Sequence, residues 1–118
     1  MAKIIALCGK ICSGKSTYAE KIRKNNNAVV LNPDIVLLTL FDGNLGDNHD
    51  EIFEKVRIYL YQMAENIINA GTNVILDFGL WTRKERYDIR LFFKKRNIDI
   101  EIHYVNTPLK ITLRKGII

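Results

Sequence analysis

The residues with the clearest chemistry lie near the start of the chain, in the stretch GKICSGKS. This stretch matches the pattern G-x-x-x-x-G-K-[ST] at every position. Glycines let backbone N–H groups approach phosphate oxygens closely, and the N-terminus of a following helix favours anions. The lysine adds a positive charge near the β- and γ-phosphates of a nucleotide, and the serine hydroxyl can ligate Mg²⁺. The motif therefore predicts a nucleotide site made of Gly9, Lys10, Ile11, Cys12, Ser13, Gly14, Lys15 and Ser16.

Two carboxylates follow other predicted strands. Asp34 comes shortly after AVVL, and Asp77 ends NVILD. Open α/β sheets bind ligands at the carboxyl ends of their parallel strands, so these carboxylates are candidates for the same cleft. Asp34 could orient an attacking hydroxyl or accept its proton, or it could only complement the dipole of the helix that it begins. Asp77 could hold Mg²⁺, often through water, or be a turn residue at the end of a strand.

Several signatures of other phosphate-handling families are absent. The letters DFG at 77–79 lack the upstream H-R-D-L-x-x-x-N of protein kinases, and no N-K-x-D selects guanine. Phe78 follows Asp77, where many motor ATPases have a water-activating glutamate. Arg83 and Arg86 open the next predicted helix and could bind a phosphate or an anionic acceptor, although solvated surface arginines are the default. They are the candidate substrate-binding residues.

Alternating strands and helices must position these residues. Short, mostly apolar runs predict strands at 3–8, 28–31, 73–77 and 99–105. Helical spacing and end signals predict helices at about 14–24, 33–41, 50–70 and 83–95, with a last one starting at Thr107-Pro108 and Gly116 near its end. The stretch 42–49 is predicted to be a loop. This alternation predicts an α/β fold, with a parallel sheet covered by helices on both faces.

The composition is that of a single soluble domain spanning residues 1–118. No apolar run reaches the roughly 18 residues that a membrane span needs. Two cysteines are too few for a disulfide framework, which predicts a reducing, cytoplasmic setting.

The net charge of +5 comes from the last third of the chain, where residues 83–118 hold ten Lys or Arg against four Asp or Glu. A basic surface suits phosphate-bearing ligands or nucleic acid. Because apolar residues at helical spacing interrupt the charges, a solvated helix face is the simpler interpretation, and nucleic-acid binding is possible but not favoured.

Four segments, in this order, resemble the small P-loop kinase-like ATP-binding proteins: LCGKICSGKSTYAEKI, VVLNPDIV, AGTNVILDFGLWTRKERYDIR and HYVNTPLKITLRK. That group is similar to the kinase domain of polynucleotide kinase, to zeta toxin and to chloramphenicol phosphotransferase. The resemblance implies a five-stranded parallel sheet in 2-3-1-4-5 order, ATP with Mg²⁺, and phosphoryl transfer to a hydroxyl of a small molecule or a nucleic-acid 5′ end. It places the acceptor-activating aspartate at Asp34 and the phosphate contacts at Gly9, Ser13, Gly14, Lys15, Ser16 and Thr17.

The sequence departs from the family at its end. In the family, the helix that starts like NTPLKITLRK continues into an arginine-bearing lid, and a fifth strand follows. Here the sequence stops at KGII. We therefore expect an incomplete P-loop domain, a three-layer α/β/α fold with four parallel strands in order 2-3-1-4 and neither fifth strand nor lid. The alternative function is a nucleotide-binding remnant with little or no turnover. An exposed edge of the fourth strand would favour a homodimer.

Overall fold

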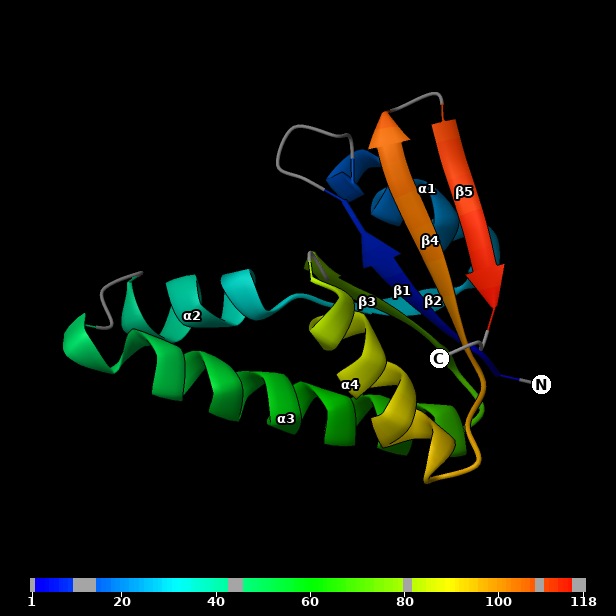
Figure 1. Cartoon of the computed structure of the whole chain (residues 1–118). Coiled ribbons are helices and arrows are strands. Elements are labelled where there is room, and N and C mark those ends of the chain that lie inside the picture. The colour runs from blue at the N-terminus through cyan, green and yellow to red at the C-terminus, as the bar shows by residue number, and fades with distance from the viewer. Residues whose placement is uncertain (1, 10–14, 43–45, 80–81, 108–109, 116–118) are drawn as a thin grey trace.

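The computed structural model describes residues 2–9, 15–42, 46–79, 82–107 and 110–115 (Figure 1). Its strands are β1 (Ile4–Cys8), β2 (Ala28–Leu31), β3 (Asn73–Gly79), β4 (Ile100–Thr107) and β5 (Lys110–Lys115). Its helices are α1 (Lys15–Asn26), α2 (Pro33–Phe41), the short 3-10 helix η1 (Gly46–Asn48), α3 (His49–Asn69) and α4 (Arg83–Lys94). The strands form one sheet in the spatial order β2-β3-β1-β4-β5.

The four predicted strands form the parallel part of the sheet. β1 pairs in parallel with β3 and with β4, and β2 pairs in parallel with β3. This confirms the predicted order 2-3-1-4. Helices cover both faces: Ile5 and Leu7 of β1 pack on the side of α1, and Ile4 and Ala6 pack on the side of α3 and α4. All five residues of β1 are consequently buried, which explains why its sequence is a continuous apolar run.

The predicted last helix, starting at Thr107-Pro108, is wrong. Residues 110–115 form β5, which pairs antiparallel with β4 and places Ile111 opposite Val105. The segment alternates polar and apolar residues, a pattern typical of strands. As a strand it also hydrogen-bonds with backbone groups along the outer edge of β4, which would otherwise lack protein partners. Gly116, expected near the end of that helix, lies outside the described residues.

The sheet therefore has a fifth strand, contrary to the expectation that only four are present. Its place is the one that the family resemblance implied, next to β4, but its direction is antiparallel where the resemblance implied a parallel strand. Because β5 covers the outer edge of β4, that edge is not the exposed dimer surface that the sequence suggested.

The remaining predicted elements agree closely with the structure. α4 begins with a capping box: the Thr82 hydroxyl accepts a hydrogen bond from the Glu85 backbone N–H, and the Glu85 carboxylate accepts one from the Thr82 backbone N–H, both at 3.0 Å. The 42–49 loop contains η1. β3 runs two residues beyond its predicted end, so Asp77 lies inside the strand.

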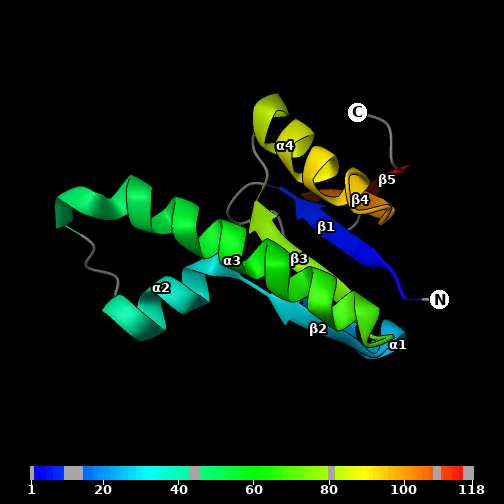
Figure 2. The same cartoon turned by 90° about the horizontal axis from the view of Figure 1, so that it is seen from below.

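α2 and the first half of α3 form an arm that projects beyond the sheet (Figures 1 and 2). The second half of α3 packs against the sheet through Leu60, Tyr61 and Ala64, which are all buried. None of the described helices combines the length and the apolar character that a membrane crossing needs.

Tyr61 is the largest of the buried side chains of α3. It is 1% exposed, and its ring centroid lies 5.2 Å from that of Phe78 and 5.6 Å from that of Phe93. We expect Tyr61→Ala to lower the free energy of unfolding by about 3–5 kcal/mol, because it removes a buried aromatic ring. Tyr59→Ala, on the same helix but 59% exposed, is the control and should change it by less than about 0.5 kcal/mol. Urea denaturation measures both, and equal losses would contradict this account of the core.

Candidate functional site

The carboxyl ends of β2, β3 and β1 lie side by side because these strands are parallel neighbours. The chain leaves β1 at Gly9, and the Gly9 N–H donates a hydrogen bond to the Gly79 carbonyl at the end of β3, with an N···O distance of 3.2 Å. Gly79 has a φ of +86°, a conformation that glycine adopts without strain. The segments that carry the candidate residues therefore start from one edge of the sheet.

The N-terminus of α1 also lies on this edge. Lys10, Ile11, Cys12, Ser13 and Gly14 lie outside the described residues, and the backbone of residues 15–18 forms the first turn of the helix. The first four N–H groups of a helix have no partner within it and carry the positive end of the helix dipole. That turn contains no acidic residue to neutralise this end. The structure thus places an anion-favouring helix terminus directly after the loop, as the motif requires.

Asp77 is buried inside the sheet, with only 3% of its surface exposed. It lies two residues after Ile75, so it belongs to the face of β3 that α1 covers. Its position within β3 excludes the interpretation as a turn residue at the end of a strand. The Asn32 side-chain N–H donates to the Asp77 carboxylate, with an Nδ2···Oδ2 distance of 3.3 Å. Asp77 is thus a buried carboxylate on the face of the sheet that α1 covers.

Asn32 is a site residue that the sequence analysis missed. Besides its contact with Asp77, its side-chain Oδ1 accepts a hydrogen bond of 2.8 Å from the Asp34 backbone N–H, which caps α2. The capping role had a signal, because an asparagine before a proline at the start of a helix is a common cap pattern. The contact with Asp77 had none, because the two residues are 45 positions apart. Asn32 links the segments that carry the two candidate carboxylates.

Asp34 lies in the first turn of α2 and is exposed. Among the described residues, no group donates a hydrogen bond to its carboxylate. Because Asn32 already caps the helix, the Asp34 side chain is not needed for that purpose. The oxygens of its carboxylate are thus accessible to a ligand. Its position in the first turn also complements the helix dipole.

Arg86 lies beside the end of β1, the strand that leads into the Gly9–Ser16 motif. Its Nη1 atom is 3.8 Å from the Cys8 sulfur, and its guanidinium carbon is 5.8 Å from the ring centroid of Tyr104 on β4. Arg83 is exposed in the first turn of α4. Of the two predicted arginines, the structure thus brings Arg86 against the strand that carries the loop.

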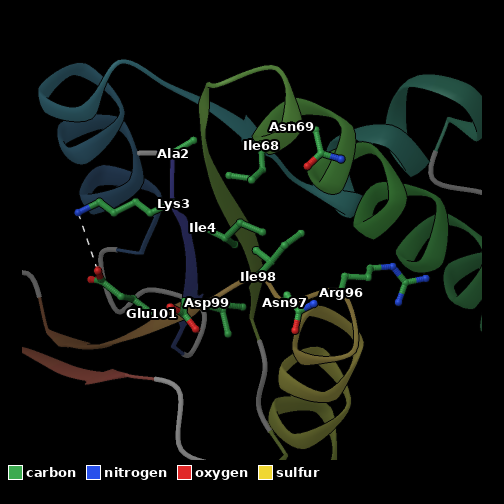
Figure 3. A pocket seen from close by; sticks show the side chains of 11 residues that line it. Ala2, Lys3, Ile4, Ile68, Asn69, Arg96, Asn97, Ile98, Asp99 and Glu101 are labelled. Carbon is green, nitrogen blue, oxygen red and sulfur yellow. Dashed lines mark ion pairs between the residues drawn. The ribbon is translucent and has the colours of Figure 1, made fainter.

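A hollow opens at the opposite edge of the sheet, where β1 and β4 begin (Figure 3). Two ion pairs involve its charged side chains: Lys3 lies 3.9 Å from Glu101, and Arg96 lies 3.4 Å from Glu65. Because the candidate residues lie at the carboxyl ends of the strands, this hollow is not part of their site.

The described residues contain no group of three or more His, Cys, Asp or Glu side chains that could hold a metal ion. Mg²⁺ does not require such a group, since it is usually bound by one or two protein oxygens together with substrate phosphates and water. A single buried carboxylate, Asp77, on the face of the sheet that α1 covers fits that kind of site.

Comparison with known proteins agrees with this geometry. A family model described as "AAA domain" matches residues 4–115. The chain belongs to this family. No curated protein matches the sequence of this AAA domain.

Solved structures show the same architecture. A chain of the Pnkp1/Rnl/Hen1 RNA repair complex is similar, with a TM-score of 0.73 and 26% identity over 92% of this chain and 34% of that one. A second structure of the Pnkp1/Rnl/Hen1 complex has a TM-score of 0.68 and 28% identity over 91% and 36%. The Mycobacterium tuberculosis APS kinase CysC has a TM-score of 0.72 and 21% identity over 94% and 80%. The AAA domain thus has a P-loop kinase-like fold, and it spans about a third of the length of the chains from the RNA repair complex.

Asn32 offers a test of how the site is held together. We expect Asn32→Ala to lower the free energy of unfolding by about 1–2 kcal/mol, because it removes the α2 cap and also leaves the Asp77 contact unmade. Asn32→Ser is the matched variant, since serine keeps a capping oxygen but has no amide to reach Asp77. Its loss of unfolding free energy should lie between zero and that of Asn32→Ala. Thermal and urea denaturation measure both, and two wild-type-like variants would show that this link contributes nothing.

Proposed function

We propose that this AAA domain binds Mg·ATP and transfers the γ-phosphate to a hydroxyl group of a small molecule. The observation that supports it is the convergence, on one edge of the sheet, of the N-terminus of α1, the buried Asp77 and the exposed Asp34. Among the neighbours of similar fold is an APS kinase structure described as a complex with AMPPNP and APS, with 22% identity over 92% of this chain and 64% of that one.

The phosphates would be held by the loop and the first turn of α1. In this proposal Lys15 is catalytic, because its charge stabilises the γ-phosphate oxygens as the bond to the leaving oxygen breaks. The hydroxyl of Ser16 and the carboxylate of Asp77 would hold Mg²⁺, which would supply positive charge against the phosphates when bound. The nucleotide-binding residues are Gly9, Lys10, Ile11, Cys12, Ser13, Gly14, Lys15, Ser16 and Thr17.

Asp34 is the second catalytic residue of the proposal. Its carboxylate accepts the proton of the acceptor hydroxyl while the hydroxyl oxygen bonds to the γ-phosphorus. The bond between the γ-phosphorus and the bridging oxygen breaks, and that oxygen leaves with ADP. The exposure of Asp34, and the capping of α2 by Asn32 instead, leave this carboxylate accessible for such a role.

Arg83 and Arg86 would bind anionic parts of the substrates. Arg86 is the better placed of the two, because its contacts with Cys8 and Tyr104 hold it beside the strand that leads into the loop. A guanidinium there can pair with phosphate oxygens through two hydrogen bonds.

The arm next to Asp34 favours a small molecule over a nucleic-acid end. Residues 33–54 contain six Asp or Glu and no Lys or Arg. On α2, Ile35 is 61% and Leu38 is 63% exposed. A nucleic acid would bring a row of phosphates past this acidic and apolar surface, and like charges repel. Tight binding to a polyanion instead requires several lysines or arginines along its path.

Binding is the first measurable consequence. We expect saturating Mg·ATP to stabilise the domain by about 2.7 kcal/mol at one hundred times Kd, because the ligand binds only the folded state. Lys15→Ala should abolish most of the rise in Tm, and EDTA should reduce it. Lys24→Ala, an exposed lysine at the far end of α1, is the matched control and should keep the rise. If the wild type shows no rise with millimolar Mg·ATP, the nucleotide site is refuted.

Transfer is the second consequence, and Asp34→Asn tests it. We expect this variant to bind Mg·ATP as the wild type does and to transfer phosphate about 10²–10⁴-fold more slowly, since the proton acceptor is lost. Asp42→Asn is the control, because residue 42 ends the same helix with a φ of 53°, which asparagine also adopts. Transfer of labelled γ-phosphate to small hydroxyl compounds and to a 5′-hydroxyl oligonucleotide is the assay.

Each outcome of that assay decides one part of the proposal. If Asp34→Asn loses stability but not phosphate transfer, Asp34 is not the proton acceptor and only complements the helix dipole. Faster transfer to the oligonucleotide than to any small hydroxyl compound would refute the small-molecule acceptor. Binding of Mg·ATP without transfer to any acceptor would support the alternative, a nucleotide-binding domain with little turnover.

A further inference from the structure

A buried histidine on β4 joins the phosphate helix to the sheet. The Tyr18 hydroxyl on α1 lies 2.6 Å from His103 Nδ1, and the two ring centroids are 5.7 Å apart. His103 Nε2 lies 3.1 Å from a carboxylate oxygen of Glu101, and His103 is only 6% exposed. None of these three residues takes part in the chemistry proposed above.

The protons of this group follow from its chemistry. A carboxylate only accepts hydrogen bonds, so His103 Nε2 donates to Glu101. In a neutral imidazole, Nδ1 is then the acceptor, and the Tyr18 hydroxyl donates to it. Burial, and after it the charge of Glu101, raises the pKa of Tyr18, so the phenol keeps the proton that it donates. Lys3 lies on the other side of Glu101 and pairs with its second oxygen at 3.9 Å (Figure 3).

Tyr18 is in the first turn of α1, the turn whose free N–H groups would meet the phosphates. Two apolar side chains of this helix are buried, Ala19 and Ile22. Ala19 is small, and Ile22 lies one turn beyond Tyr18. At the other end of α1, Asn73 donates a 2.7 Å hydrogen bond to the Asn26 carbonyl. Among the described residues, the Tyr18–His103 hydrogen bond thus ties the first turn of α1 to the sheet.

We propose that Tyr18 and His103 are positioning residues, which fix the first turn of α1 on β4 and thereby set the affinity for the nucleotide phosphates. The inference rests on the proposed function, since it concerns the same site. It assigns to His103 and Glu101, which lie far from the motif in sequence, the task of orienting Tyr18 toward the sheet.

Single and double variants test the coupling between the two residues. We expect Tyr18→Phe and His103→Leu each to raise the Kd of Mg·ATP by between about three- and tenfold, the effect of one lost hydrogen bond. The double variant should lose no more than one of the single variants, because both remove the same contact. His103→Asn places an amide oxygen near the position of Nδ1 and should restore most of the affinity.

Ile22→Val is the matched control, since it removes one buried methylene from the same helix but leaves the Tyr18–His103 contact in place. It should lower Tm and leave the Kd of Mg·ATP unchanged. If Ile22→Val weakens binding as much as Tyr18→Phe does at an equal loss of Tm, the pair acts only through stability and the proposal is overturned.

Amide hydrogen exchange gives a second measurement that needs no nucleotide. The N–H groups of residues 19–22 bond to the carbonyls of the first turn. Residues 74–76 of β3 serve as the internal reference for exchange rates. Relative to them, the N–H groups of residues 19–22 should exchange between about three- and tenfold faster in Tyr18→Phe than in the wild type, as expected for one lost hydrogen bond. Unchanged relative exchange would overturn the positioning role. If the wild type binds no Mg·ATP but exchange is still faster in Tyr18→Phe, the proposed function is refuted and the positioning role is not.

Discussion

The structure depends on the burial of β1 between two parallel neighbours and two layers of helices. Every residue from Ile4 to Cys8 is at most 8% exposed, and the strand pairs with β3 on one side and β4 on the other. A strand that is buried on both faces and paired on both edges requires an apolar sequence. Because β1 is fixed in this way, the loop that follows Cys8 leaves the sheet at a defined point, between the ends of its neighbours.

Polar contacts then orient the elements that carry the chemistry. Asn32 ties the start of α2 to the buried Asp77 on β3, and Tyr18 ties the start of α1 to the buried His103 on β4. A buried polar group is costly unless it is hydrogen-bonded, so each contact favours one arrangement of helix and sheet over others. Apolar packing alone would tolerate small shifts of both helices.

The two sides of the proposed site have opposite electrostatic character. The side of the phosphates has the N-terminus of α1, which favours anions, and Arg86 beside the end of β1. The side of the acceptor has Asp34 at the base of an arm with exposed apolar residues and an excess of acidic ones. Such a division suits a reaction in which a polyanion is held on one side and a hydroxyl loses its proton on the other.

The sequence by itself determined the elements whose signals are local. The motif from Gly9 to Ser16, the apolar run of β1 and the capping box of α4 each depend on neighbouring residues, and the four parallel strands and their order followed from them with the family resemblance. Only the tertiary structure decided the rest. Residues 110–115 form a strand because the edge of β4 offers them backbone partners, and Asn32 and Tyr18 reach residues 45 and 85 positions away. Contacts between distant segments form only when the sheet brings those segments together, so no local pattern reveals them.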